Sequence, residues 1–191
     1  VSCQFALHYF FSSKEVLDSF VRNVKECCRL DGYFIGTTYD GESVFELLQE
    51  KQKGDAITSY VKDHKVWEIT KKYDMETFEA NETSIGYPID VYQDSINKTF
   101  TEYLVHFDYF KDYMRSHGFE LVTKEQAKQM GLPNGTGLFH DLFYAMKREK
   151  QSIYKNALQM ENEEELTKIS FLNRYFVFQK VKEVGGMMMM M

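Results

Sequence analysis

Hydrophobic residues recur at three- and four-residue steps between Ser13 and Cys28, which predicts an amphipathic helix. One apolar stripe contains Val16, Leu17, Phe20, Val21, Val24 and Cys28. The preceding Ser12-Ser13 is a favourable N-cap pair. Asp31-Gly32 is expected to end the helical region, because glycine adopts the left-handed cap conformation at little cost.

Short apolar runs flank this helix at residues 1–10 (VSCQFALHYF) and 33–38 (YFIGTT), and each predicts a strand. A strand, a helix and a second strand form a βαβ unit, which requires a parallel pair. The carboxyl ends of parallel strands meet at one edge of a sheet, where ligands bind. We therefore expect His8-Tyr9 and Thr38-Tyr39-Asp40 to share one edge.

The remaining pattern predicts an α/β fold with an antiparallel β insert. Apolar and charged residues alternate in three segments that are expected to be antiparallel strands, at residues 65–69, 75–79 and 85–91. Residues 101–107 are interpreted as a strand end or a loop, and residues 161–165 as a Glu-rich linker. Helices are expected over residues 42–52, 107–116 (ended by Gly118) and 138–150, and further strands over residues 119–123 and 170–182.

Composition narrows the class of protein. The 191 residues include 16 Phe and 13 Tyr, which predicts a core rich in aromatic rings. A net charge of −6 argues against broad nonspecific binding of nucleic acid, but it leaves room for a small site that binds an RNA end. The three cysteines form no CxxC pair, which favours a reducing compartment. No apolar run reaches transmembrane length, so no membrane partner is expected.

The common catalytic motifs are missing from the sequence. The five histidines show no metal-ligand spacing, and no GxSxG turn marks a nucleophilic serine. Neither GxGxxG nor GxxxxGK[ST] occurs. Taken alone, His8 is better explained as a hydrogen-bonded histidine at a strand end than as a functional group.

Three ordered blocks carry a family resemblance: CQFALHYFF, RNVKECCRLDGYFIGTT and TEYLVHFDYF, followed by a closing SFLNRYFVFQK. They resemble the mRNA cap (guanine-N7) methyltransferases of eukaryotes and large DNA viruses. The resemblance implies a partial Rossmann-like class I SAM-dependent methyltransferase fold, containing strands four to seven and the antiparallel insert. It implies that residues 1–184 are the C-terminal part of such a domain and that residues 185–191 are a low-complexity tail.

The resemblance also implies a reaction and its site. The family transfers a methyl group from S-adenosyl-L-methionine (SAM) to N7 of the terminal guanine of 5′-capped mRNA. The N7 lone pair is already a nucleophile, so catalysis rests on positioning and needs no general base. The implied guanine-binding residues are His8, Tyr9, Tyr39, Glu102 and Tyr175, and the implied cofactor-binding residues are Gln4, Phe5 and Tyr9. Glu102 would accept hydrogen bonds from guanine N1 and the exocyclic amine.

Several positions depart from the family pattern. Tyr39 replaces a proline, and Ser12 replaces the glutamate that follows HYxF. The closing strand usually offers a tyrosine to the cap, where this chain has Asn173 with Tyr175 two residues later. The chain lacks the family's glycine-rich cofactor loop and starts at what would be the fourth strand. We therefore expect a C-terminal fragment that is inactive alone.

Two alternatives remain open at this stage. The chain could be a non-catalytic methyltransferase-fold subunit that stimulates a capping enzyme, or a methyltransferase for another substrate. The expected partners are 5′-capped mRNA and other capping-enzyme domains or a stimulatory subunit. The expected compartment is the nucleus for a cellular enzyme, and the cytoplasm (a viral factory or the virion) for one from a large DNA virus.

Overall fold

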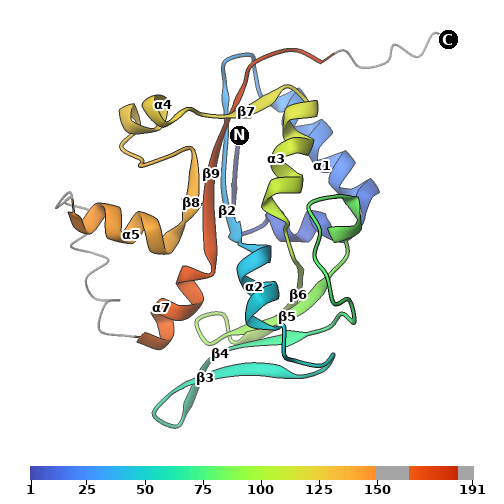
Figure 1. Ribbon diagram of the computed structural model, residues 1–191, viewed down its shortest axis with the longest axis vertical. Helices are drawn as coiled ribbons and strands as arrows, with labels where there is room; N and C mark the ends of the chain where they lie inside the picture. Colours follow the sequence, from blue (N-terminus) through green and yellow to red (C-terminus); the bar gives the residue numbers. More distant parts are fainter. Residues whose placement is uncertain (149–163, 185–191) are drawn as a thin grey trace.

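The computed structural model describes residues 1–148 and 164–184. Its main sheet has five strands (Figure 1), of which β1 and β2 are parallel and all other pairs are antiparallel. The order across the sheet is β1 (Ser2–Gln4), β2 (Tyr33–Tyr39), β9 (Asn173–Lys180) and β7 (Phe119–Leu121), and β8 (Thr136–Leu138) also pairs with β9. The expected parallel pair is confirmed.

Helices α1 (Lys14–Cys27) and α3 (Phe107–Ser116) cover one face of this sheet, and α4 (Lys124–Gln129) and α5 (Phe139–Arg148) lie on its other side (Figure 1). Ser13 caps α1 through its hydroxyl, which accepts from the Val16 amide, as the sequence predicted. The core beneath α1 and α3 is built from stacked and edge-on rings, among them Phe34, Phe110, Phe176 and Phe178.

The insert is antiparallel, as predicted, and forms a separate sheet of four strands, where the sequence predicted three (Figure 1). Its strands in spatial order are β3 (Ala56–Val61), β4 (His64–Lys71), β5 (Pro88–Gln93) and β6 (Lys98–Tyr103). The second core joins this sheet to α2 (Gly41–Leu47) and α7 (Glu164–Phe171), and the one-turn helix η2 spans Glu82–Ser84. Among the described residues, the two larger hydrophobic cores meet near the end of β2, which contributes Phe34 to the first and Tyr39 to the second, and a small third cluster joins Val122, Ala127 and Val177.

The prediction of one strand over residues 1–10 was wrong. Strand β1 ends at Gln4, Phe5 adopts a positive φ of 50°, and a 3₁₀ helix, η1, spans Leu7–Phe11. Leu7 and Phe11 are fully buried and four residues apart, which is a helical spacing. The end of the α1 region also differs, because Asp31 (φ 60°) and not Gly32 takes the left-handed conformation.

Other predicted elements also differ from the observed ones. Residues 75–79 form no strand, and the expected helix over 42–52 ends at Leu47. Strand β6 runs over residues 98–103, where the sequence suggested a strand end or loop at 101–107. The missed elements include β3, α4 and β8. Helix α7 was missed as well, because it covers residues 164–171, where the sequence predicted the end of a Glu-rich linker and the start of a strand. Helix α3 has the predicted bounds, whereas residues 149–150, 161–163 and 185–191 of the predicted segments lie outside the described residues.

Candidate functional site

A cavity of about 710 Å³ lies where the two cores meet, at the carboxyl ends of β1 and β2. Its wall combines η1, the end of β2, the β5–β6 hairpin, α7 and the first residue of β9. The predicted guanine residues that line it are His8, Tyr9, Tyr39 and Glu102. The fold therefore brings four of the five predicted guanine residues to one place.

His8 and Glu102 form the polar centre of this cavity. Residue His8 comes from η1 and Glu102 from β6, where it is the register partner of Ile89. The His8 ring lies 4.3 Å from the Tyr9 ring and 6.5 Å from the Tyr39 ring, centroid to centroid. The distance from His8 Nδ1 to Glu102 Oε2 is 3.5 Å.

Burial governs the charge of both groups. His8 is 4 % exposed and Glu102 is 7 % exposed. Desolvation lowers the pKa of His8 to about 4 and raises the pKa of Glu102 to about 7. Although the two side chains lie within ion-pair range, desolvation disfavours the charged form of each, and 3.5 Å is long for a hydrogen bond. The pair is better described as two desolvated neighbours than as a salt bridge.

Several polar atoms in this cavity lack a hydrogen-bond partner within residues 1–148 and 164–184. They are His8 Nδ1, His8 Nε2, Glu102 Oε2 and Asn173 Oδ1. The Asn173 amide nitrogen, in contrast, donates to the carbonyl oxygens of Ile169 and Ser170. A buried polar atom without a partner costs about 1–3 kcal/mol, and native proteins contain few of them. Their concentration in one cavity indicates a polar ligand.

Two tyrosines flank the polar centre. The Tyr39 hydroxyl accepts a hydrogen bond from Gln93 Nε2 at 2.9 Å, and burial raises the Tyr39 pKa. Tyr9 is 42 % exposed at the cavity wall, and its pKa is raised first by burial and then by the Glu102 carboxylate. Both phenols therefore remain protonated at neutral pH and contribute aromatic surface and hydroxyl dipoles.

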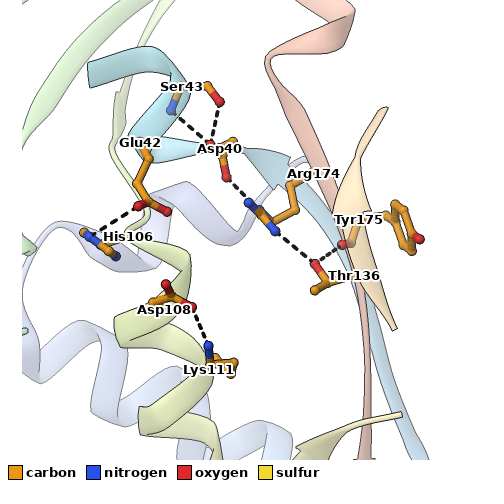
Figure 2. Close-up of polar contacts among 9 residues, drawn as sticks. All are labelled: Asp40, Glu42, Ser43, His106, Asp108, Lys111, Thr136, Arg174 and Tyr175. Carbon is orange, nitrogen blue, oxygen red and sulfur yellow. Dashed lines mark hydrogen bonds and ion pairs between the residues drawn. The ribbon is translucent and has the colours of Figure 1, made fainter. Parts of the chain in front are cut away.

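Tyr175 lies outside this cavity. Its hydroxyl donates to the Asn134 carbonyl at 3.0 Å, and its ring lines a second hollow of about 670 Å³ beside α5. In Figure 2 the ring points away from Asp40 and Arg174. Asn173, not Tyr175, is the closing-strand residue that lines the cavity with His8 and Glu102.

The predicted cofactor residues separate into two groups. Phe5 lines the cavity, is 53 % exposed and packs edge-on against Phe139 at 6.1 Å. Gln4 does not line the cavity, since its side-chain amide donates to Ser2 Oγ and accepts from Thr37 Oγ1. Phe5 and Tyr9 thus offer an exposed aromatic edge at the end of β1, whereas Gln4 is engaged along the strand.

Sequence reasoning missed part of the wall. Gln93, Ile96 and Phe100 come from the β5–β6 hairpin, and Leu166 and Ile169 come from α7. Phe100 and Glu102 are two residues apart, so a strand places them on the same face, and this spacing could have indicated that Phe100 lies beside Glu102. The α7 residues carried no signal, because the acidic run before them resembles a solvated linker.

The sheet with its parallel β1–β2 pair, antiparallel closing strand β9 and covering helices has the class I SAM-dependent methyltransferase fold. A family model described as the mRNA (guanine-N(7))-methyltransferase domain matches residues 1–181, and the chain belongs to that family. Among the residues that the structure describes, no helix is long and apolar enough to cross a membrane, and no cluster of His, Cys, Asp and Glu could hold a metal ion.

Three relatives illustrate this membership. The chain is 23% identical over 206 aligned positions to a probable mRNA-capping enzyme of Acanthamoeba polyphaga mimivirus, covering 97% of this chain and 17% of that protein. It is 29% identical over 122 positions to an mRNA cap guanine-N(7) methyltransferase of Caenorhabditis briggsae, covering 64% of this chain and 30% of that protein. A Drosophila melanogaster enzyme of the same name is 43% identical over 49 positions, covering 26% of this chain and 12% of that protein. The chain therefore spans less than a third of these relatives.

Proposed function

We propose that this chain supplies the guanine side of an enzyme that methylates N7 of the terminal guanine in 5′-capped mRNA. The proposal depends above all on one observation, the unpartnered buried polar atoms of His8, Glu102 and Asn173 in a shared cavity. Membership of the guanine-N7 methyltransferase family supports the same substrate.

Glu102 matches the hydrogen-bonding edge of guanine. The N1–H and the exocyclic amine of guanine are adjacent donors, and a carboxylate is an acceptor with two oxygens. Hydrogen bonds to a charged group are strong, and the low dielectric around a side chain that is 7 % exposed strengthens them further. Guanine would thus compensate the unfavourable burial of the Glu102 carboxylate.

His8 can bind guanine without protonating N7, which must stay free to act as the nucleophile. With a pKa of about 4 its ring is neutral at physiological pH, so one nitrogen carries a proton and the other does not. The N–H can donate to guanine O6 and leave N7 unprotonated as the nucleophile. Tyr9 and Tyr39 supply aromatic surface for a base that becomes cationic on methylation.

The chain's own residues fit one side of the methyl donor. The exposed rings of Phe5 and Tyr9 can border SAM at the end of β1, and Gln4 lies beside them on the strand. SAM supplies the methyl group when it is bound. The chain positions the acceptor base by binding one edge of it with Glu102 and His8, which lie side by side, and it excludes water through the apolar wall.

Further parts of the proposal concern activity, partners and compartment. Because the 191 residues contain no glycine-rich cofactor loop, we propose that they bind capped RNA ends without turning them over. Other capping-enzyme domains or a stimulatory subunit are proposed partners. The proposed compartment is the nucleus for a cellular protein and the cytoplasm for one from a large DNA virus. The alternative is a non-catalytic stimulatory subunit, which would not need a guanine site.

The test compares binding of GTP and ITP, which differ only in the exocyclic amine. We expect GTP to bind about tenfold or more tightly, because ITP loses one hydrogen bond to the Glu102 carboxylate. The Glu102→Gln variant should bind GTP more weakly and lose the preference, while the exposed control Glu50→Gln should behave as wild type. Isothermal titration calorimetry at pH 8 gives the dissociation constants of GTP and ITP. Equal affinities for GTP and ITP in the wild type would contradict the proposal.

A further inference from the structure

The β5–β6 hairpin presents two exposed apolar side chains to the cavity. Ile96 is 54 % exposed and Phe100 is 40 % exposed, and both line the wall. Phe100 and Glu102 lie on the same face of β6 because they are two residues apart, which separates them by about 7 Å along the strand. The hairpin end of the cavity is therefore adjacent to the guanine site but distinct from it.

This hairpin is fixed in place before any ligand binds. The Asn97 amide donates to Gln93 O at 2.8 Å, and Asn97 closes the turn with a φ of 53°. The Gln93 side chain donates to the Tyr39 hydroxyl, which ties the hairpin to the end of β2. A preformed surface of this kind loses little conformational entropy when a ligand binds.

The cavity exceeds the needs of one base. A volume of about 710 Å³ is typical of a site for a whole drug-sized ligand and is more than a single purine fills. Away from His8 and Glu102 the wall is mainly apolar and includes Leu166 and Ile169 of α7 as well as the hairpin residues. The extra space must therefore suit an apolar part of the substrate.

The charge of the lining residues indicates which part of the substrate fills the extra space. Within the described part of the chain, the residues that line this cavity include no lysine or arginine. Phosphate groups are bound mainly by such cations, whereas bases stack on aromatic rings. A capped RNA carries, beyond the triphosphate bridge, the base of its first transcribed nucleotide.

We propose that Phe100, supported by Ile96, is a stacking platform for the base of the first transcribed nucleotide. This inference rests on the proposed function, since the terminal guanine must occupy the neighbouring His8–Glu102 site. Stacking is tolerant of base identity, so the platform should accept adenine and guanine equally. It would let the chain distinguish an RNA cap from a free guanine nucleotide.

The experiment compares the dissociation constants of GTP and the dinucleotide GpppA, measured by calorimetry on the 191-residue chain. We expect GpppA to bind about tenfold more tightly, which corresponds to about 1.4 kcal/mol and lies within the range of base–aromatic stacking. In Phe100→Ala the ratio of the two constants should fall to about one. A matched control is Tyr60→Ala on β3, an aromatic side chain that is 55 % exposed and does not line the cavity.

The outcomes separate this inference from the proposed function. If GTP binds but GpppA binds no more tightly, the platform is contradicted while the guanine site stands. If Phe100→Ala weakens both ligands by the same factor, Phe100 has no specific role for the second base and the inference is also wrong. If neither ligand binds the wild type, the proposed function fails and the platform fails with it. GpppG binding as tightly as GpppA supports base-tolerant stacking.

Discussion

Two carboxylates, Asp40 and Glu102, are buried near the end of β2, and their surroundings differ. Asp40 is 3 % exposed and fully engaged: one oxygen accepts from the Ser43 amide and hydroxyl, and the other accepts from Arg174 Nε at 2.6 Å (Figure 2). Arg174 also donates to Thr136 and lies over the Phe107 ring. Glu102 is 7 % exposed, and its Oε2 has no hydrogen-bond partner among the described residues.

This difference distinguishes a structural carboxylate from a binding one. Asp40 caps α2 and joins β2 to β9, next to the register pair of Tyr39 and Asn173 that lines the cavity. Its interactions are complete without a ligand. Glu102 is held in a desolvated position that raises its pKa to about 7, and no described residue donates a hydrogen bond to its Oε2 to offset that cost. A ligand with two adjacent donors would do so.

The largest effect is expected from Asp40→Asn. The substitution leaves the Arg174 guanidinium partly buried without a charged partner, which should lower the free energy of unfolding by about 3–5 kcal/mol. Urea denaturation followed by circular dichroism measures this change. Glu102→Gln is the matched variant, and we expect it to be as stable as wild type or more stable at pH 8. Equal destabilisation by both substitutions would contradict the contrast between the two carboxylates.

A smaller effect is expected from pH. The folded-state pKa of Glu102, about 7, exceeds its unfolded value of 4.5, so the wild type should lose stability relative to Glu102→Gln as pH rises from 4.5 to 7. The total is on the order of 3 kcal/mol, and the change levels off about one pH unit above the folded-state pKa. His8 acts oppositely, because its depressed pKa costs stability as pH falls from 6.5 towards 4. Urea midpoints at several pH values test this, and a constant difference between the two proteins would refute it.

The smallest effect is expected from Gln93→Ala. The variant removes the hydrogen bond to the Tyr39 hydroxyl and should cost about 1 kcal/mol of stability. Because Gln93 ties the hairpin to β2, the same variant should also reduce the preference for GpppA over GTP. Denaturation and calorimetry measure the two effects. An unchanged preference would show that the hairpin holds its position without this contact.

Much of the fold was predictable because the spacing of apolar residues along the sequence indicates which side chains are buried. The α1 stripe, the parallel pair and α3 all follow from regular apolar spacing. Prediction failed where local patterns were broken or misleading. Strand β3 has a register irregularity between Ser59 and Tyr60, which disrupts its alternation. Apolar and charged residues alternate over residues 75–79 as they would in a strand. These residues form a loop instead, which is held by the packing of Phe78 against Phe45 and His106.

The site was predictable only in part. His8, Tyr9 and Glu102 were identified through the family resemblance, since no local pattern brings Glu102 to His8. Their proximity depends on the register of β5 with β6, which is a tertiary property. Tyr175 was assigned by the same resemblance, but its place on β9 directs it to another hollow, and Asn173 lines the cavity instead. The contribution of α7 arises from packing between distant segments.

The most direct test of the account measures the affinity for GpppA between pH 6 and pH 8. The bridging triphosphate of GpppA has no group that titrates in this range, and His8 stays neutral throughout. If Glu102 must be ionised to bind guanine, its pKa of about 7 predicts that the wild type binds about tenfold more tightly at pH 8 than at pH 6. Glu102→Gln should show weak binding that does not vary with pH. A wild-type affinity that is constant across this range, or a pH dependence that persists in Glu102→Gln, would contradict the account.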